Sequence, residues 1–264
     1  SKGDADAFVL KLNANGYFQW AKTIGTVNFD GIQKLTVNSK DQIVSVGSYK
    51  GTLEVNGQSY SSNGGNKDSY VWQLDAQGNQ LLFKTFGSYY DDSPMEVRCD
   101  ANDFIYVAGN YQGDADLNGN GSYELESRGG NDGYIIKMDQ SGNIIWDVSI
   151  GGKDSDYLNS IAIDKSNNVY AVGYYKYSAD LDEDGIDDIT SIGSEDYYVV
   201  KYSQCGSGSA STFTDVQTSC GSYTWIDGKT YTSSTSSPTY SVPGGAKSGC
   251  DSIVHLSLNV INLS

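Results

Sequence analysis

The sequence is poor in the residue types on which most catalytic and metal sites depend. It has four cysteines, a single histidine, His255, and no Gly-x-Ser-x-Gly motif. A Ser-His-Asp triad is therefore not expected, and neither is a zinc site, which needs Cys or His ligands in pairs. No apolar run approaches the roughly 20 residues of a membrane-spanning helix, so we expect no membrane insertion. These absences argue against an enzyme.

Basic residues are also few. Seventeen Lys and Arg residues stand against 33 Asp and Glu residues, which gives a formal net charge of −16. A surface of this sign repels phosphate groups, so we expect neither nucleic acid nor an anionic membrane as a partner. The chain opens at Ser1 without the charged, apolar and small-residue regions of a signal peptide. We interpret it as a mature or excised part of a longer polypeptide.

Proline (3) and methionine (2) are scarce, whereas glycine (31) and tyrosine (21) are abundant. This composition is typical of many short strands joined by tight turns. One seven-residue pattern, DAFVLKL in its first copy, occurs four times at successive offsets of 62, 64 and 64 residues. Repeats longer than about 40 residues with strand patterns indicate β-propeller blades. The copies occupy residues 6–12, 68–74, 132–138 and 196–202.

Four antiparallel strands are expected in each repeat, and such a set forms one blade. The second strand carries an aromatic residue, Trp20, Phe83 or Trp146, and the fourth ends at a glycine. We therefore expect an all-β chain that begins with a partial β-propeller over residues 1–203. It would contain three four-stranded blades at 6–67, 68–131 and 132–195, and one strand of a fourth at 196–203.

The third repeat carries the motifs IIKMD, GNIIW, GGKD and NVYAVG, which begin at Ile135, Gly142, Gly151 and Asn168. With these motifs, residues 1–203 resemble the bacterial β-propeller repeat family, whose members occur in many large secreted proteins. A ring needs at least about four blades. The resemblance thus implies that further blades of the polypeptide, or neighbouring chains as a homo-oligomer, complete the ring, and we favour the first arrangement.

The composition changes after residue 203. Residues 204–213 are rich in serine and glycine, as in a flexible linker. In residues 214–264, the motifs CGSYTW and GCDS resemble a small Ig-like repeat of giant secreted proteins from gliding-type bacteria. The resemblance implies a small Ig-like β-sandwich, export by the type IX pathway and a Cys220–Cys250 disulfide. That bond would stabilise the domain by about 3–4 kcal/mol.

The two other cysteines have different roles in this interpretation. Cys99 stands where other repeats have Val37 and Ile163, so we expect a buried, unreactive thiol. Cys205 either pairs with a cysteine outside the chain or replaces one partner of the expected disulfide. Any disulfide among the last three cysteines would imply an oxidising compartment.

The best candidate site is the acidic segment DLDEDGIDD at residues 180–188. Oxygen ligands at its positions 1, 3 and 5, glycine at 6 and an acid at 9 match the front of a calcium loop. Position 12 is Ser191, where an EF-hand has a bidentate glutamate, so a full EF-hand is absent. The expected Ca²⁺ ligands are Asp180, Asp182, Asp184, Asp188 and the backbone carbonyl of Ile186.

A weaker copy of this segment lies in the second repeat, and its neutral amide oxygens predict lower affinity. The corresponding segment of the first repeat, residues 52–57, is two residues shorter and lacks the alternating acids. The first repeat thus lacks both the two extra residues and the candidate ligands, as expected if the extra residues serve to bind an ion. The alternative for both segments is a solvated acidic hairpin. The candidate ligands of the weaker copy are Asp116, Asn118, Asn120 and Glu124.

Further acids recur between the second and third strands of every repeat, at Asp30, at Asp91 and Asp92, and at Asp154 and Asp156. Two carboxylates could hydrolyse glycosides. A catalytic pair should break the repeat symmetry, however, so we favour turn carboxylates that accept backbone N–H bonds. The many tyrosines could stack on sugar rings, but packing across strands is the commoner role.

Together these features predict a non-catalytic segment of a large secreted or cell-surface bacterial protein. The leading hypothesis is an adhesin or extracellular appendage component with calcium-stiffened blade loops. The alternative is a carbohydrate-binding propeller module that accompanies an enzyme elsewhere in the chain. The expected partners are a cell-surface or polysaccharide ligand and other domains of the parent protein.

Overall fold

The computed structural model describes residues 3–118, 122–203, 211–242 and 252–261. The chain divides into two compact units, Ser1–Tyr202 and Ser203–Ser264. In the described ranges the regular structure is β-strand, apart from one 3₁₀ turn at Asn63–Gly65, so the fold is all-β as expected. These ranges include no helix that is long and apolar enough to cross a membrane.

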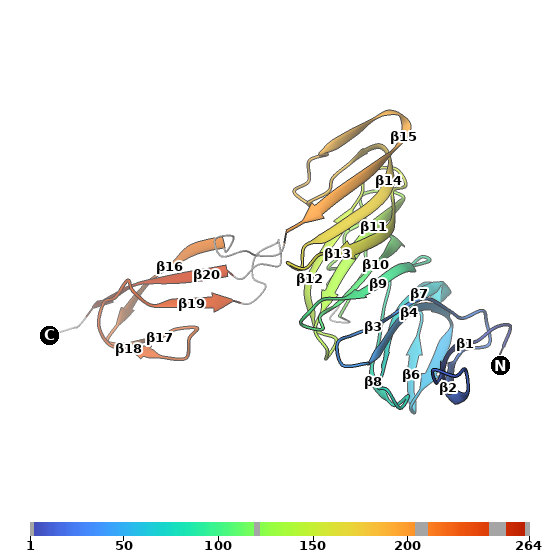
Figure 1. The fold of residues 1–264 in the computed structure, drawn as a ribbon. Helices are drawn as coiled ribbons and strands as arrows, with labels where there is room; N and C mark the ends of the chain where they lie inside the picture. Colours follow the sequence, from blue (N-terminus) through green and yellow to red (C-terminus); the bar gives the residue numbers. More distant parts are fainter. Residues whose placement is uncertain (1–2, 119–121, 204–210, 243–251, 262–264) are drawn as a thin grey trace. The chain divides into compact units, whose positions relative to one another are not determined.

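Four antiparallel sheets follow one another in chain order through the first unit (Figure 1). They are the pair β1–β2, the four-stranded sheets β3-β4-β7-β8 and β9-β10-β11-β12, and the three-stranded sheet β13-β14-β15. β5 and β6 form a separate hairpin. The strands are β1 (Ala7–Leu12), β2 (Phe18–Ile24), β3 (Gly31–Val37), β4 (Ile43–Lys50), β5 (Thr52–Val55), β6 (Gln58–Ser61), β7 (Lys67–Leu74), β8 (Gln80–Phe86), β9 (Ser93–Cys99), β10 (Ile105–Gln112), β11 (Asn131–Met138), β12 (Ile144–Ile150), β13 (Tyr157–Ile163), β14 (Val169–Ala179) and β15 (Ile189–Tyr202).

The sheets do not coincide with the sequence repeats. Each four-stranded sheet combines the last two strands of one repeat with the first two strands of the next. The chain passes from one sheet to the next between the second and third strands of a repeat. The fourth strand of a repeat pairs with the first strand of the following repeat, and Tyr49, for example, pairs with Asp68. The expected grouping, with three four-stranded blades bounded at residues 67, 131 and 195, is corrected accordingly.

One aromatic residue predicted for the second strand, Phe83, does not occupy the position equivalent to Trp20 and Trp146. Trp20 and Trp146 pair with equivalent lysines, Lys11 and Lys137, but the equivalent partner in the second repeat is Leu82. A shift of one residue moves a strand side chain to the opposite face. Phe83 therefore points the other way, where its ring lies 4.9 Å from Tyr60.

Three apolar cores join the successive sheets. Because side chains alternate along a strand, each inner strand supplies one set of residues to each neighbouring sheet. In β7, Tyr70 and Trp72 share a core with Val9 of β1, whereas Val71 shares the next core with Val97 of β9. Cys99 is partly buried against that second core, and burial raises the pKa of its thiol to about 12.

A glycine in each fourth strand makes room for a tyrosine of the next repeat. A Cβ on Gly109 would lie 2.3 Å from the Ser93 carbonyl oxygen and 2.7 Å from the Tyr134 hydroxyl. Gly47 and Gly173 are confined in the same way. At Gly47, the Tyr70 hydroxyl donates a hydrogen bond of 3.0 Å to the Gly31 backbone carbonyl. The glycines that close the repeat pattern are thus required by packing.

We expect Gly109→Ala to destabilise the first unit by about 2 kcal/mol, because the added methyl group has no free space. Urea unfolding followed by tyrosine and tryptophan fluorescence measures the loss. Gly193→Ala is the matched control, since nothing lies within 4 Å of its Cβ position. Equal stability of the two variants would contradict the packing argument.

The second unit is a small mixed β-structure. β20 (Ser252–Ile261) pairs in parallel with β16 (Ser211–Cys220) and antiparallel with β19 (Thr239–Val242). β17 (Tyr223–Thr224) and β18 (Thr230–Tyr231) form a short hairpin beside them. Trp225 is buried against apolar residues of β20, among them Leu256 and Leu258, and its indole N–H donates to Asp215. Cys205 and Cys250 lie outside the described residues, so the expected Cys220–Cys250 disulfide stays a prediction.

Candidate functional site

The acidic segment 180–188 forms the loop between β14 and β15. Asp180 exchanges two backbone hydrogen bonds with Gly151 of the preceding sheet, at 3.0 and 3.1 Å. The loop closes where the Asp188 N–H donates to the Ala179 carbonyl at 2.9 Å. Gly185 has a φ of +87°, a conformation that other L-residues rarely adopt. The loop is therefore anchored at both ends and turns at its glycine.

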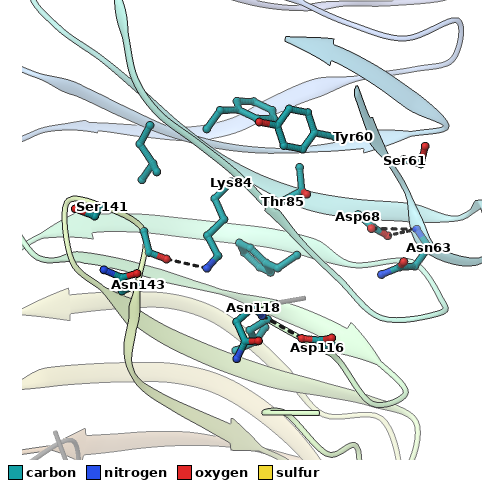
Figure 2. Close-up of a pocket in the computed structure, with 15 residues that line it drawn as sticks. Tyr60, Ser61, Asn63, Asp68, Lys84, Thr85, Asp116, Asn118, Ser141 and Asn143 are labelled. Atoms are coloured by element: carbon teal, nitrogen blue, oxygen red, sulfur yellow. Dashed lines mark hydrogen bonds between the residues drawn. The ribbon is translucent and has the colours of Figure 1, made fainter. Parts of the chain in front are cut away.

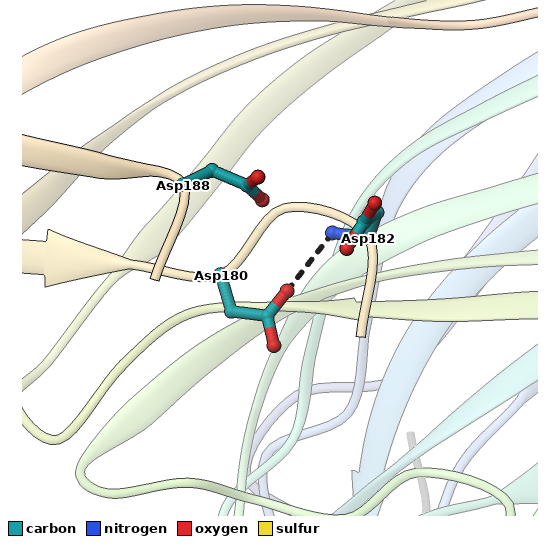
Figure 3. Close-up of side chains that lie close together, drawn as sticks. All are labelled: Asp180, Asp182 and Asp188. Carbon is teal, nitrogen blue, oxygen red and sulfur yellow. Dashed lines mark hydrogen bonds between the residues drawn. The ribbon is translucent and has the colours of Figure 1, made fainter. Parts of the chain in front are cut away.

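Three carboxylates converge in this loop (Figure 3). Asp180, Asp182 and Asp188 each offer one oxygen, and these oxygens lie within 4.8 Å of one another. Asp180 is only 2% exposed, whereas the other two are open to solvent. Partial desolvation raises the pKa of Asp182, and the neighbouring carboxylates add to the rise. A cation among these oxygens would relieve their repulsion.

Backbone N–H groups fix the orientation of the buried carboxylate. Asp180 Oδ1 accepts hydrogen bonds from the backbone N–H groups of Asp182, at 3.1 Å, and Glu183, at 2.8 Å. Its Oδ2 accepts the N–H of Gly185 at 2.9 Å. Asp188 Oδ2 accepts the N–H of Leu181 at 2.7 Å. Both acids are thus held in place by the loop itself.

Arg128 supplies one positive charge to the same loop. Its guanidinium lies 3.0 Å from the Asp180 carboxylate and 3.2 Å from that of Asp187, and it donates to the Gly185 carbonyl at 3.2 Å. The sequence prediction missed this residue, because its partners are more than 50 positions away. The only clue to it in the sequence is that the chain contains just two arginines.

Asp184, one of the four expected carboxylate ligands, is not part of the converging group. Its carboxylate instead accepts the backbone N–H of Ile186 at 2.8 Å, within the turn. The backbone carbonyl of Ile186 stays a predicted ligand, because the converging group is defined by carboxylate oxygens alone. The remaining set, three carboxylates in a glycine-containing loop, still suits Ca²⁺, which prefers hard oxygen ligands in a flexible arrangement.

The weaker copy in the second repeat has the same closing bonds. The Leu117 N–H donates to the Glu124 carboxylate at 2.7 Å, as Leu181 does to Asp188. Asn118 then uses its amide nitrogen to bind Glu124 at 2.5 Å, and its backbone N–H donates to Asp116. Asn120 lies outside the described residues. Because the Asn118 amide nitrogen donates to the Glu124 carboxylate, this loop offers a cation fewer free carboxylate oxygens than the segment 180–188 does.

The first repeat has a regular hairpin at this place. Thr52–Val55 and Gln58–Ser61 pair along their whole length. The turn residues Asn56 and Gly57 have φ values of +50° and +80°, as in a type I′ turn. The shorter segment thus forms strand pairs and does not bring several acids together.

The recurring acids between sheets are turn carboxylates. Asp30, Asp92 and Asp156 are buried at equivalent places. Each accepts a backbone N–H from the residue four positions earlier, at 2.5, 2.8 and 2.6 Å respectively. Asp156 also accepts the Lys176 N–H at 2.7 Å. Their shared role in backbone hydrogen bonding agrees with the structural interpretation and gives no support to a catalytic pair.

Asp92 lies beside a second buried acid. A Cβ on Gly87 would lie 2.7 Å from both the Asp92 carboxylate oxygen and the Asp68 carboxyl carbon, so the two side chains meet over this glycine. Burial raises the pKa of Asp68 to about 7 and that of Asp92 to about 8, and the Asp68 charge contributes to the latter. One or both carboxyls are therefore protonated near neutral pH.

A polar pocket of about 540 Å³ opens where the second repeat meets the third (Figure 2). The Lys84 ammonium donates to the Gly142 carbonyl at 2.7 Å within it. A similar pocket of about 410 Å³ occurs one repeat earlier around Lys22, Gly78 and Asn79. The feature thus belongs to the repeat geometry. Residues at the larger pocket include Tyr60, Phe83, Lys84, Asp116, Asn118 and Asn143.

Sugar stacking was one possible role of the many tyrosines, but Tyr174 and Tyr175 pack within the protein. Tyr174 stacks on Tyr157 with a centroid distance of 4.9 Å, and Tyr175 is buried in a core. Tyr89, Tyr90 and Tyr177 remain exposed, and the first two contact each other edge to face. Exposed aromatic area is therefore present, but it is scattered.

Comparison with known proteins gives distant relatives. No protein-family model matches the chain. It is 22% identical over 191 residues to an uncharacterised WD repeat-containing protein of Acanthamoeba polyphaga mimivirus, covering 62% of this chain and 14% of that protein. It is 24% identical over 173 residues to the regulatory protein FlaEY of Caulobacter vibrioides, covering 62% of this chain and 18% of that protein.

The chain thus spans less than a fifth of the length of these relatives. Similarity to a WD-repeat protein agrees with the repeated antiparallel sheets of the first unit, and fits a β-propeller-like repeat protein.

Proposed function

We propose that this chain is a non-catalytic segment of a large secreted or cell-surface bacterial protein, such as an adhesin or an extracellular appendage component. In it, a partial β-propeller related to the bacterial β-propeller repeat family precedes a small Ig-like unit. The observation that carries the proposal is the loop 180–188, where three carboxylates meet between β14 and β15. Calcium at this loop stiffens the repeat unit in the extracellular medium.

The residues that would hold the ion are Asp180, Asp182 and Asp188, whose oxygens converge. Asp180 joins the loop to Gly151 of the preceding sheet, so an ion bound there ties two sheets together. We propose a structural role for Ca²⁺ at this loop, with export by the type IX pathway and a Cys220–Cys250 disulfide as parts of the same proposal.

Two single substitutions in this loop test whether it binds calcium. We expect millimolar Ca²⁺ to raise the melting temperature of the wild-type chain by several degrees over chelator, because a ligand stabilises the folded state that binds it. Asp182→Asn should abolish that shift. Asp184→Asn should keep it, since Asp184 lies outside the converging group. Equal shifts in both variants, or none in the wild type, would contradict the site.

Surface binding tests the wider function. The labelled chain is incubated with whole cells and with a polysaccharide panel, in Ca²⁺ and in chelator. Calcium-dependent capture by cells, lost in Asp182→Asn and kept in Asp184→Asn, supports an adhesive module. Absence of capture under both conditions speaks against adhesion by this segment.

A carbohydrate-binding propeller module is the second candidate. The pocket beside Tyr60 and Phe83 favours it, because aromatic rings and amide side chains together suit a sugar. Capture by one polysaccharide without calcium, weakened by Tyr60→Ala, would select this candidate over the first.

A further inference from the structure

A pocket of about 330 Å³ is lined by two exposed tyrosines and two acids. The tyrosines are Tyr89 and Tyr123, which are 65% and 60% exposed, and the acids are Asp114 and Asp116. None of the described residues that line this pocket is basic. This tyrosine pocket therefore combines aromatic faces with negative charge.

Glycines fix the positions of Tyr89 and its neighbour Tyr90. A Cβ on Gly64 would lie 3.0 Å from the Tyr89 ring, and a Cβ on Gly113 would lie 3.1 Å from the Tyr90 ring. The two rings contact each other edge to face, with their centroids 5.4 Å apart. The Tyr89 carbonyl accepts a side-chain N–H of Asn66 at 2.9 Å. Tyr89 thus offers a ligand an exposed ring that is already ordered, which lowers the entropic cost of binding.

The tyrosines of this pocket are specific to one repeat. Tyr89 corresponds to Val27 and Lys153, since each stands three positions before the buried turn acid of its repeat. Tyr123 corresponds to Asp187, since each stands seven positions after the first acid of its loop. Residues that build the fold recur in all three repeats, as the turn acids do. Two exposed aromatics that occur once are therefore better explained by ligand binding than by packing.

The next junction between repeats shows that a cation fits at this place. Arg128 and Asn63 are equivalent, because each donates its backbone N–H to the aspartate that begins the following copy of the repeat, at 2.9 and 3.0 Å respectively. The Arg128 guanidinium lies 3.0 Å from the carboxylate of Asp180, the equivalent of Asp116. Asn63 and Asp116 both line the tyrosine pocket. At the junction of the first two repeats, a neutral amide thus stands where the next junction has a cation of its own.

We propose that the tyrosine pocket binds an amino sugar through its ammonium group. The carboxylates of Asp114 and Asp116 accept charge-assisted hydrogen bonds from the ammonium. The rings of Tyr89 and Tyr123 attract the positive charge and cover the apolar face of the sugar. The pocket volume lies near the lower end of the range for small-molecule sites, which suits one sugar ring. The inference rests on the proposed surface-binding function for its biological role, and it is independent of calcium.

The larger pocket around Lys84 gives room for the next sugars of a chain. Asn63 and Asp116 line both pockets, and they lie toward the end of the larger one that is opposite Ser141 and Asn143 (Figure 2). Aromatic rings and amide side chains in that pocket suit the neutral hydroxyl groups of a sugar. A linear polysaccharide with amino groups therefore uses both pockets, whereas a lysine side chain of a partner protein would fill only the first.

Three trisaccharides that differ only at carbon 2 test the ligand class. They are β-1,4-linked trimers of glucosamine, N-acetylglucosamine and glucose, which carry an ammonium, a neutral amide and a hydroxyl group at that carbon. Calorimetric titration of the intact chain measures their binding at pH 6 in chelator, with about 0.15 M salt to screen attraction by the acidic surface as a whole. We expect the glucosamine trimer to bind about ten-fold more tightly than the other two, because only its ammonium forms charge-assisted hydrogen bonds with the carboxylates.

Three substitutions locate the site. Asp114→Asn removes a charge but keeps an oxygen for the backbone N–H that Asp114 accepts at 2.9 Å, and Tyr123→Ala removes an exposed ring. Each should weaken binding of the glucosamine trimer about ten-fold. Asn63→Arg copies the arginine of the next junction and should abolish binding, because the guanidinium then occupies the place of the ammonium. Asp184→Asn is the matched control, since it removes the same charge from an exposed residue elsewhere and should bind as the wild type does.

Equal affinity for the three trimers, or binding of none, would overturn the inference. Equal weakening by Asp114→Asn and Asp184→Asn would also overturn it, because the ligand would then respond only to the overall charge. Capture by whole cells is measured on the same variants. Calcium-dependent capture without binding of the glucosamine trimer rejects the tyrosine pocket and leaves the proposed surface function in place. Binding of the trimer without capture supports the pocket and speaks against the surface function.

Discussion

Replacing Asp92 by asparagine is expected to stabilise the first unit by about 3 kcal/mol at pH 9, with almost no effect near pH 4. Asp92 is 2% exposed, and one of its carboxylate oxygens has no hydrogen-bond partner among the described residues. The other accepts the Ser88 N–H at 2.8 Å, a bond that an asparagine oxygen can also accept. The variant thus removes a buried charge and keeps the bond.

The sign follows from the pKa values. Burial raises the pKa of Asp92 from 3.8 to about 8, so the folded state holds this proton more tightly than the unfolded state. The stability that the group contributes is fully present below about pH 4 and is lost as the pH rises through 8. The full shift corresponds to about 5–6 kcal/mol. We expect roughly half of it, because Asp68 and Asp92 titrate as a coupled pair and the shift is shared between the two carboxyls.

Urea unfolding at pH 4, 7 and 9 measures this dependence. The wild type should lose stability between the first and last pH values more steeply than Asp92→Asn. Asp91→Asn is the neighbouring control, since Asp91 is exposed and accepts the Lys67 N–H. Parallel curves for all three proteins would show that Asp92 ionises freely in the folded state.

Local patterns in the sequence predicted the strands well, because alternation and turn residues act within a few positions. The turns after the first strand of each repeat illustrate this. Asp75 and Asp139 accept backbone N–H groups from the residues two and four positions later. The assignment of strands to sheets was wrong, because pairing between Tyr49 and Asp68 is decided by packing across repeats.

The misplacement of Phe83 has a simpler cause. The pairing of the first two strands has the same irregularity in all three repeats, so it does not set the second repeat apart. Trp20 and Trp146 stand 14 positions after Asp6 and Asp132, whereas Phe83 stands 15 positions after Asp68. An aromatic residue one position later looked equivalent to Trp20. Chemical similarity therefore misplaced the residue by one position, although the strand itself was predicted.

For the candidate site, spacing alone selected Asp180, Asp182 and Asp188 correctly as neighbours in space. It also selected Asp184, because alternation cannot show that this carboxylate caps a turn at Ile186. No local sequence pattern could predict the contact of Arg128 with this loop, because the guanidinium comes from the preceding repeat. Ion binding, the ligands Asn120 and Ile186, and the disulfide stay predictions.

Arg128→Gln should make the stability of the first unit depend on calcium. Asp180 is buried, and Arg128 is its nearest positive charge at 3.0 Å. Loss of one partner of a buried ion pair costs about 3–5 kcal/mol. Arg128 is partly exposed, so we expect a loss of about 2 kcal/mol in chelator. Glutamine can still donate an amide N–H to the Gly185 carbonyl.

In millimolar Ca²⁺ we expect the variant to regain most of this stability and to bind the ion about ten-fold more tightly than the wild type. The guanidinium and the cation neutralise the same carboxylate, so removal of one strengthens the other. Thermal unfolding and calorimetric titration measure the two effects. Arg98→Gln is the control, because Arg98 pairs with Glu96 at 2.9 Å, in a different sheet from Asp180.

The combination of outcomes separates two roles of Arg128. A destabilised variant that calcium rescues shows that the loop 180–188 is a cation site whose affinity the arginine limits. A destabilised variant that calcium leaves unchanged shows that the arginine is the permanent counterion of Asp180, so that the acidic loop needs no metal. In that case the second-repeat loop, where Asn118 already binds Glu124, would be the closer analogue of this site.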